Sequence, residues 1–304
     1  MASRLNNIIE TLRQKHLQSP VDRWEGLEEE DKPNCSICND KEIVIYRVHK
    51  DTEWQWNETL QSCVPVSRVL EVDYHLGRVC SPGDAWEWHD SYSERCSCVK
   101  QKSIKNLLRS SEITEQFRKH EFKSFVTEGK DQVIKDAYQC AKEYILEFDE
   151  IKRSRSNSIA LLGQPGSGKT HLLTAIANSL MKNKQVSVLY FPYVEGFDDL
   201  KDDFEKLEEK MSRMKKVDVL FIDDLFKPVG KSRWPRATEW QIEKMYALIN
   251  YRYLNHLPIL ISSELTVDEL EHIDEALGTR IYEMCKHYMV LILGEKKRLN
   301  QRLS

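Results

Sequence analysis

The segment Gly163-Gln164-Pro165-Gly166-Ser167-Gly168-Lys169-Thr170 decides how this chain folds. It fits the phosphate-loop pattern GxxxxGK(S/T) and lies between a short apolar run and an amphipathic helical pattern, which is the context that the pattern requires. Glycines let the backbone curl so that successive N–H groups face an anion, and the positive end of the following helix points to the same place. We therefore predict a site for the phosphates of a nucleotide. The residues expected to contact it are Gly163, Pro165, Gly166, Ser167, Gly168, Lys169, Thr170 and His171.

Short apolar runs alternate with amphipathic helical patterns in the second half of the chain. The runs are residues 158–162, 186–191, 217–222, 258–262 and 288–293. Five buried strands separated by helices are typical of an α/β domain with a mainly parallel sheet. The sequence therefore predicts this fold class for the region that carries the phosphate loop.

Polar side chains follow two of these runs. Asp223 and Asp224 come directly after residues 217–222. We expect Lys169 to contact the β and γ phosphates, Thr170 and Asp223 to lie on the magnesium side, and Asp224 to orient water for attack on the γ phosphate. Many phosphate-loop ATPases have glutamate at the last position, so the shorter Asp224 leaves open whether hydrolysis is slow.

The run 258–262 ends in Ser262 and is followed by Ser263 and Glu264, and these polar groups would lie near the phosphates if this strand inserts beside the first one. Arg280 is expected on a turn before the last apolar run. A surface ion pair is the simpler interpretation of a lone arginine. The alternative is that it enters the nucleotide site of a neighbouring subunit, where such a residue raises turnover by roughly 10³ to 10⁵.

Four segments, LLGQPGSGKTHLL, VLFIDDLFKP, NYRYLNHLPILISSELT and EALGTRIYEM, together resemble AAA+ helicase loaders of the DnaC and DnaI type, in particular the forms of Firmicutes and their phages. The resemblance covers about residues 158–294. It implies a five-stranded AAA+ sheet with helices on both faces, use of ATP and Mg²⁺, and self-association through this domain. It also implies binding to the hexameric replicative DNA helicase and to single-stranded DNA, onto which the helicase is delivered during replication initiation.

The resemblance assigns further roles within the ATPase domain. It favours Arg280 as an arginine finger. The usual sensor asparagine of the family aligns with Glu264, directly after Ser263, so the residue that senses the γ phosphate stays open. Arg298 is the best candidate for a second sensor arginine.

Six of the eight cysteines lie in an aromatic-rich region, which we expect to be irregular and to form a small domain of its own. Cys35 and Cys38 form a CxxC pair, and Cys96 and Cys98 form a CxC pair after a long insertion. Four thiolates satisfy the tetrahedral preference of Zn²⁺, and the segments CSIC and CSCVKQKSIKNLL resemble the amino-terminal zinc region of some loaders. The residues that could replace one of these ligands are Cys63, Cys80, His75 and His89.

These patterns divide the chain into three parts. Residues 1–109 are expected to form an amphipathic helix, with Leu5 and Leu12 on one face, and a zinc-binding domain. The resemblance implies that this domain contacts the helicase. Residues 110–157 are expected to form a helical connector, and residues 158–304 to form the AAA+ ATPase domain that the resemblance implies. Helices are expected at 100–109 and 134–148.

A basic loop that begins with Lys227 follows the acidic pair. Its expected DNA contacts are Lys231, Arg233, Trp234 and Arg236. Basic groups neutralise phosphates, and a tryptophan offers a stacking surface for an unpaired base. The alternative is a solvated loop that packs one tryptophan.

Composition excludes several classes of protein. The 304 residues include 45 basic and 49 acidic side chains, and the net charge of −4 argues against coating of nucleic acid by the whole surface. No run approaches the roughly 18 to 20 apolar residues that span a bilayer, and the first residues lack a secretory signal, so we expect a cytoplasmic protein without a membrane partner. Alternatives to the loader are an IstB-like transposition ATPase, a replication initiator, and an adaptor that binds ATP without hydrolysing it.

Overall fold

The computed structural model describes residues 34–49, 53–59, 61–65, 69–73, 88–198, 200, 203–229, 234–235 and 237–301. The helix expected around residues 5–12 lies outside these ranges. The chain divides into two compact units, Met1–Ser103 and Ile104–Ser304. Within the described ranges, no helix is both long enough and apolar enough to cross a membrane.

The first unit contains antiparallel strands. β1 (Ile43–His49) lies between β4 (Val69–Asp73) and β5 (Trp88–Arg95), while β2 (Trp54–Asn57) pairs with β3 (Ser62–Pro65). The expectation that this region is irregular was therefore wrong for its described part. The strands are short, and the sequence of β5 is mostly polar. Backbone pairing with β1 therefore determines the extended conformation of β5 more than an alternation of apolar and polar side chains does.

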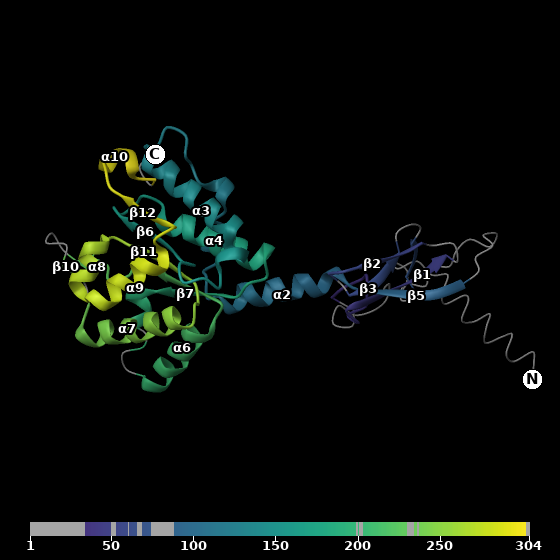
Figure 1. Ribbon diagram of the computed structural model, residues 1–304. Helices are drawn as coiled ribbons and strands as arrows, with labels where there is room; N and C mark the ends of the chain where they lie inside the picture. The colour runs from purple at the N-terminus through teal and green to yellow at the C-terminus, as the bar shows by residue number, and fades with distance from the viewer. Residues whose placement is uncertain are drawn as a thin grey trace, which may run out of the picture. The chain divides into compact units, whose positions relative to one another are not determined.

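The second unit is built on a parallel sheet (Figure 1). Its strands are β6 (Ile159–Gly163), β7 (Val188–Pro192), β8 (Val219–Asp223), β11 (Ile259–Ser263) and β12 (Met289–Ile292), in the order β12-β6-β11-β8-β7. The predicted α/β class and five-stranded sheet are confirmed. β6, β8 and β11 are buried along their whole length because helices cover both faces, which explains their uninterrupted apolar sequences.

Helices form a layer on each face of this sheet. α3 (Gln132–Ile151) and α4 (Lys169–Asn183) pack in one hydrophobic core; α5 (Tyr193–Asp198), α6 (Phe204–Lys216), α7 (Glu239–Leu254), α8 (Val267–Ile273) and α9 (Glu275–Cys285) pack in the other. The remaining elements are α2 (Ser97–Ser110), the 3₁₀ turns η2 (Phe117–Lys119) and η3 (Phe122–Ser124), the short pair β9 (Pro228–Val229) and β10 (Trp234–Pro235), and α10 (Lys296–Leu299). The helices expected at 100–109 and 134–148 are present as α2 and α3.

The sheet order decides where functional side chains meet. β11 pairs with β6 on one side and with β8 on the other, as the sequence analysis required. Parallel strands bring their carboxyl ends to one edge, so the phosphate loop after β6, the two aspartates at the end of β8 and the serines at the end of β11 meet there.

Candidate nucleotide site and cysteine cluster

The phosphate loop depends on three glycines. Gly163, Gly166 and Gly168 have φ angles of +102°, +79° and +90°, in the left-handed region that favours glycine. A Cβ at Gly163 would lie 2.3 Å from the carbonyl oxygen of Ile292, and one at Gly168 would lie 2.5 Å from a ring carbon of Phe125. The loop therefore has the curled backbone that presents N–H groups to an anion, and a side chain on these glycines would disrupt it.

Two other parts of the second unit pack against this loop. Phe125 contacts Gly168 from the amino-terminal side. From the carboxyl-terminal side, the backbone N–H of Gln301 donates to the carbonyl oxygen of Gly166 at 2.8 Å, and its side-chain amide donates to the carbonyl oxygen of Val126 at 3.2 Å. Gln301 thus connects the loop to the segment that precedes α3.

Lys169 begins α4 and is only 5% exposed. Its Nζ donates to the carbonyl oxygens of Gly163 at 2.8 Å and Gln164 at 2.7 Å. Burial lowers the pKa of Lys169 to about 8, and the negative charges of Asp224 and Glu264 oppose that change. An ammonium that is desolvated in this way gains strongly from an incoming phosphate.

The other loop residues have contacts within the protein. The buried Ser167 hydroxyl donates to the carbonyl oxygen of Gln164 at 2.8 Å and closes the loop, which also contains Pro165. His171 stacks on His120, with ring centroids 4.3 Å apart, and its Nε2 lies 3.1 Å from the Ser124 hydroxyl oxygen. Burial lowers the pKa of both histidines. His171 therefore fastens the segment before α3 to the first turn of α4.

Asp223 and Thr170 provide the oxygen atoms that suit a magnesium ion. The Thr170 hydroxyl donates to Asp223 Oδ1 at 2.9 Å. Adjacent ligands of an octahedral Mg²⁺, each roughly 2.1 Å from the metal, are about 3 Å apart, so the two side chains fit this ion. Burial raises the pKa of Asp223, while the hydrogen bonds from Ser262, Thr170 and Tyr190 counteract that rise.

Tyr190 was not among the predicted site residues, and Ser262 was predicted only as a polar group at the end of its strand. The Ser262 hydroxyl donates to Asp223 Oδ1, and the Tyr190 hydroxyl donates to Oδ2 at 3.1 Å. Ser262 was visible in the sequence as a polar residue at the end of an apolar strand. Tyr190 lies inside an apolar run, where its hydroxyl gave no separate signal.

Asp224 has a left-handed backbone with φ of +55°. Its N–H donates to the Ser262 hydroxyl oxygen at 2.8 Å, and its carboxylate forms an ion pair with Lys227 at 2.5 Å. Asp224 therefore lies beside Asp223 at the carboxyl end of β8, with its charge partly neutralised by a residue three positions later.

The two sensor candidates have different surroundings. Ser263 is fully buried; its hydroxyl donates to the carbonyl oxygen of Leu225 at 2.7 Å and accepts from the N–H of Leu265 at 3.1 Å. Glu264 acts electrostatically on Lys169 and Lys227. Glu264 is thus the one that interacts with the charges of the site.

Arg280 lies within α9, so the turn expected at this position was wrong. Asp274 caps the helix by accepting from the N–H of Leu277 at 2.7 Å, which starts the helix before the arginine. Arg280 Nε donates to Asn250 Oδ1 at 2.9 Å, and its guanidinium lies 5.1 Å from the ring centroid of Tyr246. Arg298 lies in α10 and pairs with Glu295 at 3.2 Å, where both side chains are exposed.

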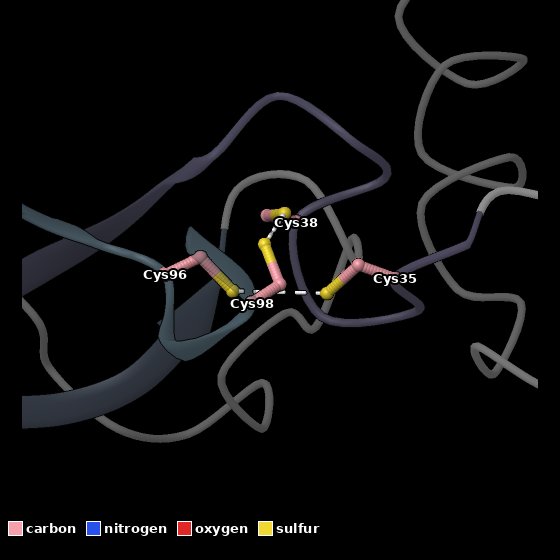
Figure 2. A group of neighbouring side chains, drawn as sticks. All are labelled: Cys35, Cys38, Cys96 and Cys98. Atoms are coloured by element: carbon pink, nitrogen blue, oxygen red, sulfur yellow. Dashed lines mark hydrogen bonds between the residues drawn. The ribbon is translucent and has the colours of Figure 1, made fainter. Parts of the chain in front are cut away.

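The first unit brings four thiols together. The sulfur atoms of Cys35, Cys38, Cys96 and Cys98 all lie within 4.8 Å of one another (Figure 2). The Cys35–Cys96 distance is 3.7 Å and the Cys38–Cys98 distance is 3.4 Å. Four sulfurs bound to one zinc at about 2.3 Å are separated by about 3.8 Å, so the cluster fits Zn²⁺.

The burial and backbone contacts of this cluster also suit a metal. Cys38, Cys96 and Cys98 are buried. Burial by itself would raise the pKa of Cys35, but hydrogen bonds from the backbone of Cys38 and Ile37 lower it to about 7. Of the rival ligands, Cys63 is exposed on β3 and outside the cluster. His75, Cys80 and the side chain of His89 lie outside the described residues.

The predicted DNA contacts fall largely outside the described residues as well. Lys231, Arg233 and Arg236 are not described, and for Trp234 only the backbone is described, as part of β10. The predicted DNA contacts of these four side chains therefore lie outside the described residues.

Comparisons with known proteins agree with this fold. Residues 116–285 match the family of the bacterial DnaA ATPase domain. The chain is 54% identical over 297 residues to the uncharacterized protein YqaM of Bacillus subtilis (strain 168), covering 98% of this chain and 94% of YqaM. It is 63% identical over 209 residues to the phage-like element PBSX protein XkdC of the same strain, covering 69% of this chain and 78% of XkdC.

One solved structure extends the comparison to three dimensions. A crystal structure of the DnaC helicase loader superposes with a TM-score of 0.50 and 20% sequence identity. The superposition covers 59% of this chain and 100% of the loader chain. This likeness shows a shared fold. The resemblance to AAA+ loaders that the sequence suggested is confirmed, and with it the AAA+ ATPase fold of the second unit.

Proposed function

This chain belongs to the family of the bacterial DnaA ATPase domain, and from that premise we propose that it is an ATP-dependent loader of a hexameric replicative helicase. It binds the helicase and delivers it onto single-stranded DNA during replication initiation. The observation that carries the ATP-dependent part is the contact between Thr170 and Asp223 beside the buried Lys169. The loader part rests on the sequence segments that resemble DnaC and DnaI.

The residues of the nucleotide site have separate roles in this proposal. The loop N–H groups and Lys169 hold the phosphates, while Thr170 and Asp223 hold Mg²⁺. The ion, when bound, neutralises phosphate charge as a Lewis acid. Ser262 and Tyr190 orient Asp223 through their hydroxyl groups.

Asp224 acts on the attacking water. The water oxygen bonds to the γ phosphorus, the bond from that phosphorus to the β,γ-bridging oxygen breaks, and Asp224 accepts a proton from the water. ADP and phosphate are the products. Glu264 is the proposed γ-phosphate sensor, because its charge acts on both lysines of the site.

The first unit contacts the helicase in this proposal. Its cysteine cluster holds Zn²⁺, and a structural zinc stabilises a small domain that buries little apolar surface. The basic loop around Lys231 and Arg233 contacts single-stranded DNA. If so, replacement of Lys231, Arg233 and Arg236 by alanine weakens DNA binding and flattens its dependence on salt concentration.

Self-association through the ATPase domain, with Arg280 as an arginine finger, is part of the same proposal. Arg280→Ala removes the finger but keeps the nucleotide site, whereas Lys169→Ala removes phosphate binding but keeps the finger. A mixture of the two inactive variants should therefore regain ATP hydrolysis. Failure of every mixing ratio to exceed the separate variants contradicts a finger that acts between subunits.

Helicase transfer onto circular single-stranded DNA tests the whole proposal, because a closed ring cannot thread onto a circle from an end. Wild-type protein with ATP should leave helicase on the circle after gel filtration and should release phosphate. The Lys169→Ala variant should do neither. A wild-type protein that neither binds the helicase nor transfers it would refute the loader function.

One observation favours a second candidate. Because Lys227 neutralises Asp224, the chain could act as an adaptor in which ATP is only a conformational ligand. Binding of ATP without phosphate release, in the presence of both helicase and DNA, would favour the adaptor.

A further inference from the structure

A second lysine enters the acidic side of the nucleotide site. Lys227 Nζ lies 2.5 Å from Asp224 Oδ2, and the Lys227 N–H donates to the Asp224 carbonyl oxygen at 3.1 Å, which closes the turn after β8. The side chains are 44% and 32% exposed, so solvent screens the pair only in part. The carboxylate assigned to the attacking water is therefore already bound to a cation of its own chain.

The backbone around Asp224 is fixed by β11. The N–H groups of Asp224 and Leu225 donate to the hydroxyl and carbonyl oxygens of Ser262, at 2.8 Å and 2.9 Å. Phe226 is fully buried and, like Asp224, has a positive φ, of 50°. Such backbone persists only where neighbouring contacts hold it. Separation of the ion pair therefore has to come from movement of Lys227.

The surrounding charges keep Lys227 protonated. Burial by itself would lower its pKa, but the hydrogen bond and charge of Asp224, together with the charges of Glu264 and Glu195, raise the pKa above its ordinary value. The charges of Asp224 and Glu264 also act on Lys169. Lys227 is also the last residue before β9, so the ion pair lies between the carboxyl end of β8 and the β9–β10 pair.

We propose that Lys227 masks Asp224 and thereby holds the basal rate of ATP hydrolysis down. The ammonium holds Oδ2 of Asp224, so this oxygen is not free to accept a proton from the attacking water. Full turnover requires Lys227 to leave Asp224. The inference rests on the proposed function, because it concerns the regulation of the same hydrolytic site.

Phosphate release by the full-length protein at saturating ATP and Mg²⁺ tests this inference. Lys227→Met keeps the length of the side chain and removes its charge, and Lys227→Gln provides a second neutral variant. Both should raise kcat about fivefold, as expected for loss of one partly screened ion pair, while the affinity for a fluorescent ADP analogue changes less than about twofold. Lys227→Arg, which keeps the charge, should show a smaller increase than Lys227→Met.

Lys206 provides a matched control. It forms a Lys–Asp pair of the same i,i+3 spacing with Asp203, at 3.0 Å, on the surface of α6. Lys206→Met should leave kcat unchanged, which shows that loss of a lysine charge in general does not raise turnover.

The nucleotide-binding measurement separates the two possible failures. A kcat that is unchanged or reduced in either neutral variant overturns the mask. A wild-type protein that does not bind the nucleotide refutes the proposed ATPase itself. If wild-type protein binds ATP without turnover, a gain of turnover in Lys227→Met still supports the mask.

Discussion

Two adjacent serines at the end of β11 allow a sharp test of the nucleotide site. The Ser262 hydroxyl donates to the buried Asp223 carboxylate and accepts from the N–H of Asp224. The Ser263 hydroxyl instead bonds to two backbone groups, the carbonyl oxygen of Leu225 and the N–H of Leu265. Both residues are fully buried. Replacing either by alanine removes one oxygen atom at nearly the same depth.

The expected loss of stability follows from these bonds. Ser262→Ala removes a hydrogen bond to a charged group and leaves a buried N–H without its acceptor, which together cost about 2 to 4 kcal/mol. Ser263→Ala breaks two neutral hydrogen bonds and should cost about 1 to 3 kcal/mol. These ranges overlap, so the dependence on pH has to distinguish the variants.

Asp223 supplies that dependence. Its pKa in the folded state is raised by burial, so its protonated form favours folding below the unfolded pKa, and this contribution is lost as the pH rises through the folded pKa. The Ser262 hydroxyl limits the rise, and its removal raises the pKa further. Each additional unit costs about 1.4 kcal/mol at neutral pH. Ser262→Ala should therefore destabilise the protein more at neutral pH than near pH 4, with no such difference for Ser263→Ala.

Urea denaturation followed by far-UV circular dichroism, at several pH values without nucleotide or Mg²⁺, measures both free energies of unfolding. Equal pH dependence in the two variants would refute the argument, because it would mean that Ser262 does not stabilise the ionised Asp223.

Three further predictions concern other parts of the molecule. The pKa of Lys169 is lowered to about 8, so nucleotide binding to the free protein needs an added proton above that pH. Nucleotide affinity of the wild-type protein, measured by fluorescence titration, should therefore fall between about pH 7 and pH 9.5, and a flat profile contradicts this prediction. Gly168→Ala should abolish nucleotide binding, because the new Cβ would lie 2.5 Å from a ring carbon of Phe125. Gly129→Ala is the control: its Cβ has open space, so it should cost only about 1 to 2 kcal/mol of stability through backbone strain and leave the nucleotide affinity unchanged. Zinc analysis by mass spectrometry should find one ion in wild-type protein and in Cys63→Ser but less in Cys38→Ser; equal zinc in both variants would refute the four-cysteine assignment.

The ATPase fold was predictable because its signals are local. The glycine pattern fixes a loop, and a parallel sheet covered on both faces produces apolar runs without interruption, as in β8. Neither signal needs information about distant contacts. The strands of the first unit lack such runs, since β5 is paired to β1 through its backbone and carries mostly polar side chains.

The candidate site was predictable only in part. Lys169, Thr170 and Asp223 belong to motifs, and the structure brings them together. The contacts of Tyr190 and Lys227 depend on how close β7 and the turn after β8 come to the aspartates, which periodicity does not specify. The helix around Arg280 was missed because its cap at Asp274 precedes the segment that was interpreted as a turn.

Gln301 gives the nucleotide site a mechanical consequence. This one residue holds Gly166 through its backbone N–H and Val126 through its side-chain amide. The segments around Val126 and Gln301, which are far apart in the sequence, are thereby both connected to the phosphate loop. A change in the backbone of the phosphate loop should therefore affect both segments together. If the loop binds a nucleoside triphosphate as proposed, we expect hydrogen exchange at residues 121–130 and 294–301 to change together on binding.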